Sequence, residues 1–168
     1  MNYGAIYNCD TTNGLGVRVS LFVSGCHFHC KECFNEVAWD KNYGKLYTKE
    51  TKNKLLNLLS PTYISGITIL GGEPFEEYNI NEIYELITDI RNTFKDSKNI
   101  WIYTGYLYED LINDHKRNKI LNLINTLVDG PFEIDKKNLN LKFRGSSNQR
   151  IINVKESLKQ NKVVLLDL

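Results

Sequence analysis

Three cysteines in one short stretch constrain this chain more than any other feature of its sequence. Cys26, Cys30 and Cys33 have the spacing Cys-x3-Cys-x2-Cys, which allows three thiols of one loop to bind a single metal centre. Thiolates are soft ligands that select iron–sulfur clusters, zinc or copper over hard cations. The chain has only one other cysteine, Cys9. The pattern therefore indicates a metal site and not a disulfide framework.

The number of ligands favours an iron–sulfur cluster. A [4Fe–4S] cluster normally takes four thiolates, so three ligands leave one iron open to bind a substrate. Two alternatives remain: a structural zinc site completed by Cys9, His27 or His29, and an electron-transfer cluster with Cys9 as its fourth ligand. Zinc motifs usually come as two separated pairs, and no second Cys-x2-Cys pair is present. We expect Cys9 to be an ordinary buried thiol.

Length and charge narrow the class of protein. The 168 residues fit one compact domain, residues 1–168. Basic and acidic residues number 21 and 20, so we expect neither nucleic acid nor an anionic membrane as a partner. No run approaches the ~20 apolar residues of a membrane span, and the start, MNYGAIYNCD, lacks the features of a signal peptide. We expect a cytoplasmic protein, because thiols stay reduced there.

Apolar patterning predicts alternating strands and helices. Strands are predicted at Val17–Val23, Gly66–Leu70, Asn99–Tyr103 and Thr126–Val128, with two later ones at Leu139–Phe143 and Val163–Leu166. Helices are predicted from a cap at Thr48 to Leu59, from a capping signal at Asn79 to Phe94, and as one or two helices over Leu107–Ile124.

This alternation predicts an α/β fold with a mainly parallel sheet and crossover helices. The chain is too short for a full eight-stranded barrel, which takes about 250 residues. We therefore expect a partial, incomplete β/α barrel with a curved sheet. Ligands of such sheets bind at the carboxyl ends of the strands. The cysteine loop and three motifs, Gly71–Pro74 (GGEP), Tyr103–Tyr106 (YTGY) and Asp129–Phe132 (DGPF), follow strands and should share one rim.

The rim motifs supply the candidate residues for binding a cofactor. Glycine lets the backbone approach a ligand closely, and proline fixes a turn. The carboxylate of Glu73 is suited to an ammonium group, and Thr104 and Asp129 could make polar contacts. The candidates on these motifs are Gly71, Gly72, Glu73, Pro74, Thr104 and Asp129. The polar stretch Arg144–Arg150 (RGSSNQR) is either an exposed hairpin loop or a lid or docking surface.

The cysteine spacing resembles the CxxxCxxC signature of radical S-adenosylmethionine enzymes, and GGEP resembles the motif that holds the methionine amino group there. The resemblance implies a [4Fe–4S] cluster on the three cysteines, with S-adenosylmethionine chelating the open iron. One electron then splits this cofactor into methionine and a 5′-deoxyadenosyl radical. No catalytic residue beyond the cluster ligands is implied. Many members carry an aromatic residue just before the third cysteine to pack on adenine. Here Glu32 occupies that position and Phe34 follows, so both are candidates for the cofactor contact.

A narrower resemblance extends over most of the chain. The run GCHFHCKECFN, then GGEP, YTGY, DGPF and RGSSNQR, is similar in content and order to activating proteins of anaerobic (class III) ribonucleotide reductase. This implies an activase that forms a glycyl radical on the large subunit of the reductase, with an external one-electron donor such as a flavodoxin. A radical enzyme acting on another glycyl-radical enzyme or on a small molecule, and a structural zinc-binding module, remain the alternatives.

Overall fold

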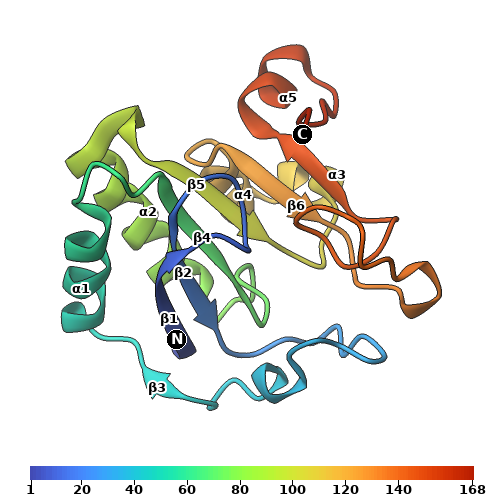
Figure 1. Cartoon of the computed structure of the whole chain (residues 1–168), viewed down its shortest axis with the longest axis horizontal. Helices are drawn as coiled ribbons and strands as arrows, with labels where there is room; N and C mark the ends of the chain where they lie inside the picture. The colour runs from blue at the N-terminus through green and yellow to red at the C-terminus, as the bar shows by residue number, and fades with distance from the viewer.

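The computed structural model describes all 168 residues, and one seven-stranded sheet forms its centre (Figure 1). The strands are β1 (Asn2–Asp10), β2 (Arg18–Val23), β3 (Lys45–Leu46), β4 (Gly66–Gly71), β5 (Asn99–Tyr103), β6 (Thr126–Asp129) and β7 (Arg150–Asn153). Their order in the sheet is β3-β1-β2-β4-β5-β6-β7. The central strands β2, β4, β5 and β6 are parallel to their neighbours in this group. Antiparallel β1 and β7 flank them.

The helices are α1 (Lys49–Leu59), α2 (Ile80–Phe94), α3 (Tyr108–Asn113), α4 (His115–Leu121) and α5 (Val154–Gln160), with short 3-10 helices η1 (Glu36–Trp39), η2 (Lys95–Ser97) and η3 (Ile134–Lys136). Helices α1 to α4 lie in the connections between the parallel strands, and α5 follows β7. The predicted cap of α1 is confirmed, because the Thr48 hydroxyl accepts a hydrogen bond from the Thr51 backbone N–H in a capping box. None of the helices combines the length and the apolar character that a membrane crossing needs.

The two faces of the sheet differ in what covers them. Alternate residues of β2 and β4, such as Leu21 and Ile69, belong to a core of 24 buried residues that includes apolar side chains of α1, α2 and α4. In Figure 1, α2 and α4 lie behind the sheet and α1 stands at its left side. The opposite face carries only a small cluster of Trp101, Val128 and Ile151, and loops lie in front of it. One face of the sheet is therefore available for a site.

Polar contacts hold the β1–β2 hairpin loop across that open face. Arg18 is 1% exposed, donates to the Thr68 hydroxyl (2.7 Å) and lies over the Trp101 ring, 5.3 Å from its centroid. Asp10 accepts hydrogen bonds from Thr12, Asn13 and Ser20. Burial alone would raise the pKa of Asp10, but these hydrogen bonds outweigh burial and lower it to about 2. The loop is thus fixed at the amino ends of the strands.

The predicted α/β class, the four parallel strands and the three helical regions are confirmed. The prediction of a strand at Leu139–Phe143 is wrong, because these residues form turns. The prediction of a strand at Val163–Leu166 is also wrong: only a single bridge joins Leu165 to Ile152. The sequence pattern does not predict the strands β1, β3 and β7 or the helix α5. The last strand of the sheet is β7. It pairs with β6 at the edge where a strand at Leu139–Phe143 would have had to pair.

Candidate functional site

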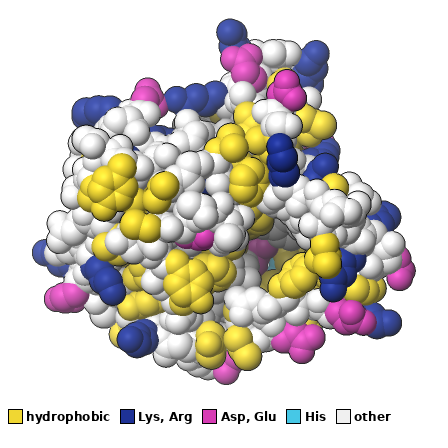
Figure 2. Space-filling model, in the orientation of Figure 1, with side chains coloured by type: hydrophobic (Ala, Val, Ile, Leu, Met, Phe, Trp, Pro, Cys, Tyr) yellow, Lys and Arg dark blue, Asp and Glu magenta, His cyan; other side chains and the backbone are white.

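A cavity of about 880 Å³ lies on the open face, at the carboxyl ends of the parallel strands. Figure 2 shows the hollow, with hydrophobic side chains on both sides of it. The cysteine loop, the end of β4, the end of β5 and the segment that follows β6 all contribute to its lining. The volume lies in the upper part of the range of small-molecule pockets, about 300–1,000 Å³. The motifs that the sequence placed on one rim thus surround one cavity.

All three predicted ligand cysteines line this cavity, and none forms a disulfide. Backbone hydrogen bonds from Gly25 to Ala38 (2.7 Å) and from Cys26 to Trp39 (3.2 Å) anchor the start of their loop. A further bond from Cys33 N–H to the Cys30 carbonyl (3.1 Å) closes the turn between these two ligands.

The donor set fits an iron–sulfur cluster. No three His, Cys, Asp or Glu side chains are grouped closely enough to hold one metal ion. A zinc ion needs all of its ligands within about 2.3 Å of one point. A [4Fe–4S] cluster instead places each thiolate on a different iron, so its ligands stand farther apart. Cys26, Cys30 and Cys33 line one cavity, and their thiolates are the donors that iron–sulfur clusters take.

Burial changes the acidity of two of these thiols. Burial raises the pKa of Cys26 to about 11, although backbone N–H groups of Phe28 and His29 favour the thiolate. Burial also raises the pKa of Cys30, against the effect of the Phe132 backbone N–H. Both thiols are therefore protonated at neutral pH, and metal binding must displace their protons.

The GGEP turn packs directly against the cysteine loop. Gly71 has φ +108°, and a Cβ on Gly72 would lie 2.4 Å from the carbonyl oxygen of Gly25. The Glu73 backbone N–H donates to the same carbonyl at 2.7 Å. Only glycine permits this approach, so the two glycines set the distance between GGEP and the first cysteine.

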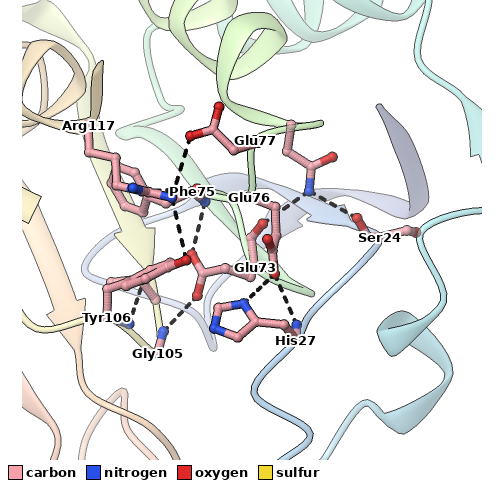
Figure 3. Close-up of polar contacts among 11 residues, drawn as sticks. Ser24, His27, Glu73, Phe75, Glu76, Glu77, Gly105, Tyr106 and Arg117 are labelled. Carbon is pink, nitrogen blue, oxygen red and sulfur yellow. Dashed lines mark hydrogen bonds and ion pairs between the residues drawn. The ribbon is translucent and has the colours of Figure 1, made fainter. Parts of the chain in front are cut away.

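Glu73 is the one fully buried carboxylate that lines the cavity, and it is held by three hydrogen bonds (Figure 3). Its Oε1 accepts from Phe75 N–H (2.9 Å) and from the Thr104 hydroxyl (2.9 Å), and its Oε2 accepts from Gly105 N–H (2.8 Å). Burial raises the pKa of Glu73 to about 7, while these hydrogen bonds favour the charged form. A cationic ligand beside Glu73 would favour that form further.

The two histidines of the cysteine loop support the loop and do not line the cavity. His27 Nδ1 lies 2.6 Å from Glu76 Oε1, which also accepts from the His27 backbone N–H (3.0 Å; Figure 3). The Phe28 ring packs against Tyr106, with centroids 5.1 Å apart. His29 stacks on Trp39 at 4.5 Å. These contacts join the loop to the connection between β4 and α2, to the YTGY turn and to η1.

Not every predicted cofactor contact reaches the cavity. Cys26, Cys30, Cys33, Phe34, Gly71, Gly72, Glu73 and Thr104 line it, whereas Glu32, Pro74 and Asp129 do not. Glu32 is exposed on the outer side of the loop. The buried carboxylate of Asp129 accepts from Tyr108 N–H (2.8 Å) and pairs with Arg150. Asp129 therefore joins β6 to β7 and α3.

The structure adds one residue that the sequence did not single out for this site. The side-chain amide of Asn79 donates to the carbonyl oxygens of Ser24 (2.9 Å) and Glu73 (3.0 Å), so it links β2 to the GGEP turn. The expected side-chain cap of Asn79 on α2 is absent, although the helix begins at the next residue. Cys9, predicted to be buried, is exposed.

Comparisons with known proteins agree with this site. A family model described as "4Fe-4S single cluster domain" matches residues 12–152. The anaerobic ribonucleoside-triphosphate reductase-activating protein of Enterobacteria phage T4 is 41% identical over 90% of this chain and 93% of its own length. The protein of the same name from Escherichia coli K12 is 40% identical, over 89% and 96%. That of Vibrio cholerae is 37% identical, over 90% and 97%. With matches of this extent, the chain belongs to the family of anaerobic ribonucleoside-triphosphate reductase-activating proteins and contains a 4Fe-4S single cluster domain.

Proposed function

We propose that this chain is the activating enzyme of an anaerobic ribonucleoside-triphosphate reductase and generates a glycyl radical on the large subunit of that reductase. One observation carries the proposal: the thiols of Cys26, Cys30 and Cys33 and the buried carboxylate of Glu73 line the same cavity. The names of the relatives support the identity of the partner.

Cys26, Cys30 and Cys33 would hold a [4Fe–4S] cluster and leave its fourth iron for S-adenosylmethionine. When bound and reduced, this pair of cofactors supplies a 5′-deoxyadenosyl radical, with release of methionine, and the radical takes a hydrogen atom from a glycine of the partner. The parallel strands β2, β4, β5 and β6 and the open face support an incomplete β/α barrel of the radical S-adenosylmethionine type, formed by residues 1–168 as one domain.

The remaining cavity residues suit the other end of the cofactor. Gly71 and Gly72 allow the methionine part to approach the backbone, and Glu73 can accept a hydrogen bond from its ammonium group. Thr104 lines the cavity next to Glu73. Phe34 lines the cavity mouth and offers an aromatic surface for adenine.

An external one-electron donor, such as a flavodoxin, would reduce the cluster. Exposure of Lys31 and Glu32 supports this, because a cluster in their loop would lie close to the surface. A cytoplasmic location fits the four free cysteines, since thiols persist in reducing compartments.

The test is cofactor cleavage under anaerobic conditions. The full-length protein is reconstituted with iron and sulfide, reduced with dithionite and mixed with S-adenosylmethionine, and 5′-deoxyadenosine and methionine are quantified. We expect both products in equal amounts and, with the reductase present, a glycyl radical signal in electron paramagnetic resonance.

Two cysteine variants make this test specific. Cys30→Ala should lose the brown cluster and lower both products to background, because a cluster with two ligands is not retained. Cys9→Ala is the matched control and should keep cluster and products, because Cys9 is exposed and does not line the cavity. Near-normal cleavage by Cys30→Ala would contradict the proposed function.

A further inference from the structure

Residues 72–79, called here the clamp segment, connect β4 to α2 and lie against the start of the cysteine loop. Figure 3 draws the hydrogen bonds that join Ser24 and His27 of the loop to this segment. The side chains of Glu76 and Asn79 are buried in the clamp segment, yet neither lines the cavity. The proposed function gives these two buried polar side chains no direct contact with the cofactor, so their role must lie in what they hold.

The clamp segment binds the backbone of the loop on both sides of Cys26, the first of the three cysteines. The hydrogen bonds run from Asn79 Nδ2 to the Ser24 carbonyl (2.9 Å), from Glu73 N–H to the Gly25 carbonyl (2.7 Å), and from His27 N–H to Glu76 Oε1 (3.0 Å). The same Glu76 oxygen lies 2.6 Å from Nδ1 of the His27 ring. The position of Cys26 is therefore set through both of its neighbours in the chain.

Asn79 and Glu76 hold the GGEP turn as well. The Asn79 amide nitrogen that donates to Ser24 also donates to the Glu73 carbonyl, at 3.0 Å. The Glu76 backbone N–H donates to that carbonyl at 3.3 Å. Both residues thus contact the cysteine loop and the backbone of Glu73 at once. They fix how Cys26 and Glu73 stand relative to each other.

Asn79 makes this link at a cost in stability. Its side chain is fully buried, and its Oδ1 has no hydrogen-bond partner among the residues of the protein. A buried amide oxygen without a partner lowers the free energy of unfolding. A leucine of similar size would avoid this cost, and proteins keep such unfavourable groups at functional sites. The unpaired oxygen therefore favours a functional role for the Asn79 amide over a purely structural one.

The proposed function requires one S-adenosylmethionine molecule to reach both the cysteine loop and Glu73, and the inference rests on it. The gap between Cys26 and Glu73 must then match that molecule before it binds. We propose that Glu76 and Asn79 are positioning residues that set this gap, by holding the backbone on both sides of Cys26 against the GGEP turn. They act through Cys26 and Glu73 and do not touch the cofactor themselves.

The affinity of the cluster-loaded, full-length protein for S-adenosylmethionine, measured by anaerobic equilibrium dialysis, tests the proposal. Glu76→Leu and Asn79→Leu should each bind about tenfold more weakly at unchanged iron content, because the three cysteines remain but the start of their loop is no longer held. Glu76→Gln should bind within about twofold of the wild type, because its amide oxygen still accepts from the His27 N–H. Glu77→Leu is the matched control: the exposed side chain of Glu77 pairs with Lys116 (2.8 Å), so affinity should stay unchanged.

Amide hydrogen exchange of the metal-free protein gives a readout that needs no cofactor. The His27 N–H should exchange faster in Glu76→Leu than in the wild type, because it loses its acceptor. The N–H groups of Gly25 and Cys26 donate to the backbone of Ala38 and Trp39 and serve as internal references. Unchanged exchange at His27 would show that Glu76 does not hold the loop and would overturn the proposal.

The binding experiment separates the other possible failures. Wild-type affinity in both leucine variants would overturn the proposal. So would a Glu76→Gln protein that binds as weakly as Glu76→Leu, because the charge of Glu76 and not its hydrogen bond would then matter. Loss of iron or of the folded state in both leucine variants would overturn it too, since the contacts would then be structural only. A wild-type protein that does not cleave S-adenosylmethionine would contradict the proposed function itself, whatever the variants show.

Discussion

At the scale of single residues, the carboxylate of Glu73 is held by hydrogen bonds from two parts of the chain that are far apart in sequence. The sequence singles it out, because an acidic residue directly after a buried strand and two glycines is a strong local signal. Two of its hydrogen-bond donors, Thr104 and Gly105, come from the end of β5, more than 30 residues away. The sequence predicts Thr104 as a cofactor contact, whereas the structure directs its hydroxyl to Glu73. Thr104 is therefore expected to act through the orientation of Glu73.

Thr104→Val tests that role. The variant removes a hydrogen bond to a carboxylate, so the affinity of the cluster-loaded protein for S-adenosylmethionine should fall about tenfold, or about 1.4 kcal/mol. Equilibrium dialysis measures the affinity, and iron content should not change. Thr104→Ser should restore binding, and Thr88→Val, at a partly exposed site on α2 far from the cavity lining, is the matched control. Equal affinity for Thr104→Val and the wild type would show that the hydroxyl has no positioning role.

Asp129 is a residue whose hydrogen-bond partner the sequence does not predict. Its place after a strand and before a Gly–Pro turn predicts a cofactor contact, yet both of its oxygens bind Arg150. Arg150 reaches Asp129 because β7 pairs antiparallel with β6, with these two residues in register. The sequence does not predict β7, so it could not identify the partner that occupies the carboxylate.

At the scale of elements, the segment of residues 131–149, called the rim segment, differs from the strand predicted at Leu139–Phe143. The alternation of apolar and polar residues in this stretch is typical of a strand. A strand needs a neighbour, however, and β7 already pairs with the free edge of β6. The apolar side chains face the cavity instead, where Leu141 and Phe143 line it. The same alternation therefore lines one side of the cavity.

Gln149→Leu tests whether the hydrogen bonds of the Gln149 side chain to Gly145, Ser146 and Gly130 hold this segment in place. The variant loses three hydrogen bonds and leaves two backbone N–H groups without their partner, so the free energy of unfolding should fall by about 2–3 kcal/mol. Limited proteolysis should cut first between residues 131 and 149, since these residues form no core. Gln160→Leu, on the exposed end of α5, should behave as the wild type. Unchanged protease resistance in Gln149→Leu would mean that other contacts hold the rim segment.

At the scale of the whole molecule, the core and the site occupy opposite faces of the sheet. The apolar side chains of α1, α2 and α4 pack on one face, and the cavity lies on the other. No cysteine of the loop belongs to either hydrophobic cluster. The fold therefore does not depend on the metal centre for its core.

Removal of the cluster should accordingly leave the protein folded. We expect the far-ultraviolet circular dichroism of the chelated, metal-free protein to match that of the loaded protein, in contrast to zinc fingers, which unfold without metal. Thermal unfolding should remain cooperative, with a lower midpoint because a ligand of the folded state has been removed. Loss of helical signal on chelation would show that the cluster organises the fold itself.

The sequence by itself determined the three-cysteine motif, the glycine-rich turn, the parallel strands and the family, because these depend on residue types at short spacing. Cys26, Cys30 and Cys33 lie within eight residues of one loop, and GGEP begins at the last residue of β4. Only the tertiary structure decided three interactions. The Thr104 hydroxyl donates to Glu73, Arg150 forms an ion pair with Asp129, and Gln149 of RGSSNQR donates to the Gly130 carbonyl. The physical reason is the same in each case: a polar side chain can be satisfied by any partner within about 3 Å. Which partner lies there depends on strand order, and strand order is a property of the whole sheet.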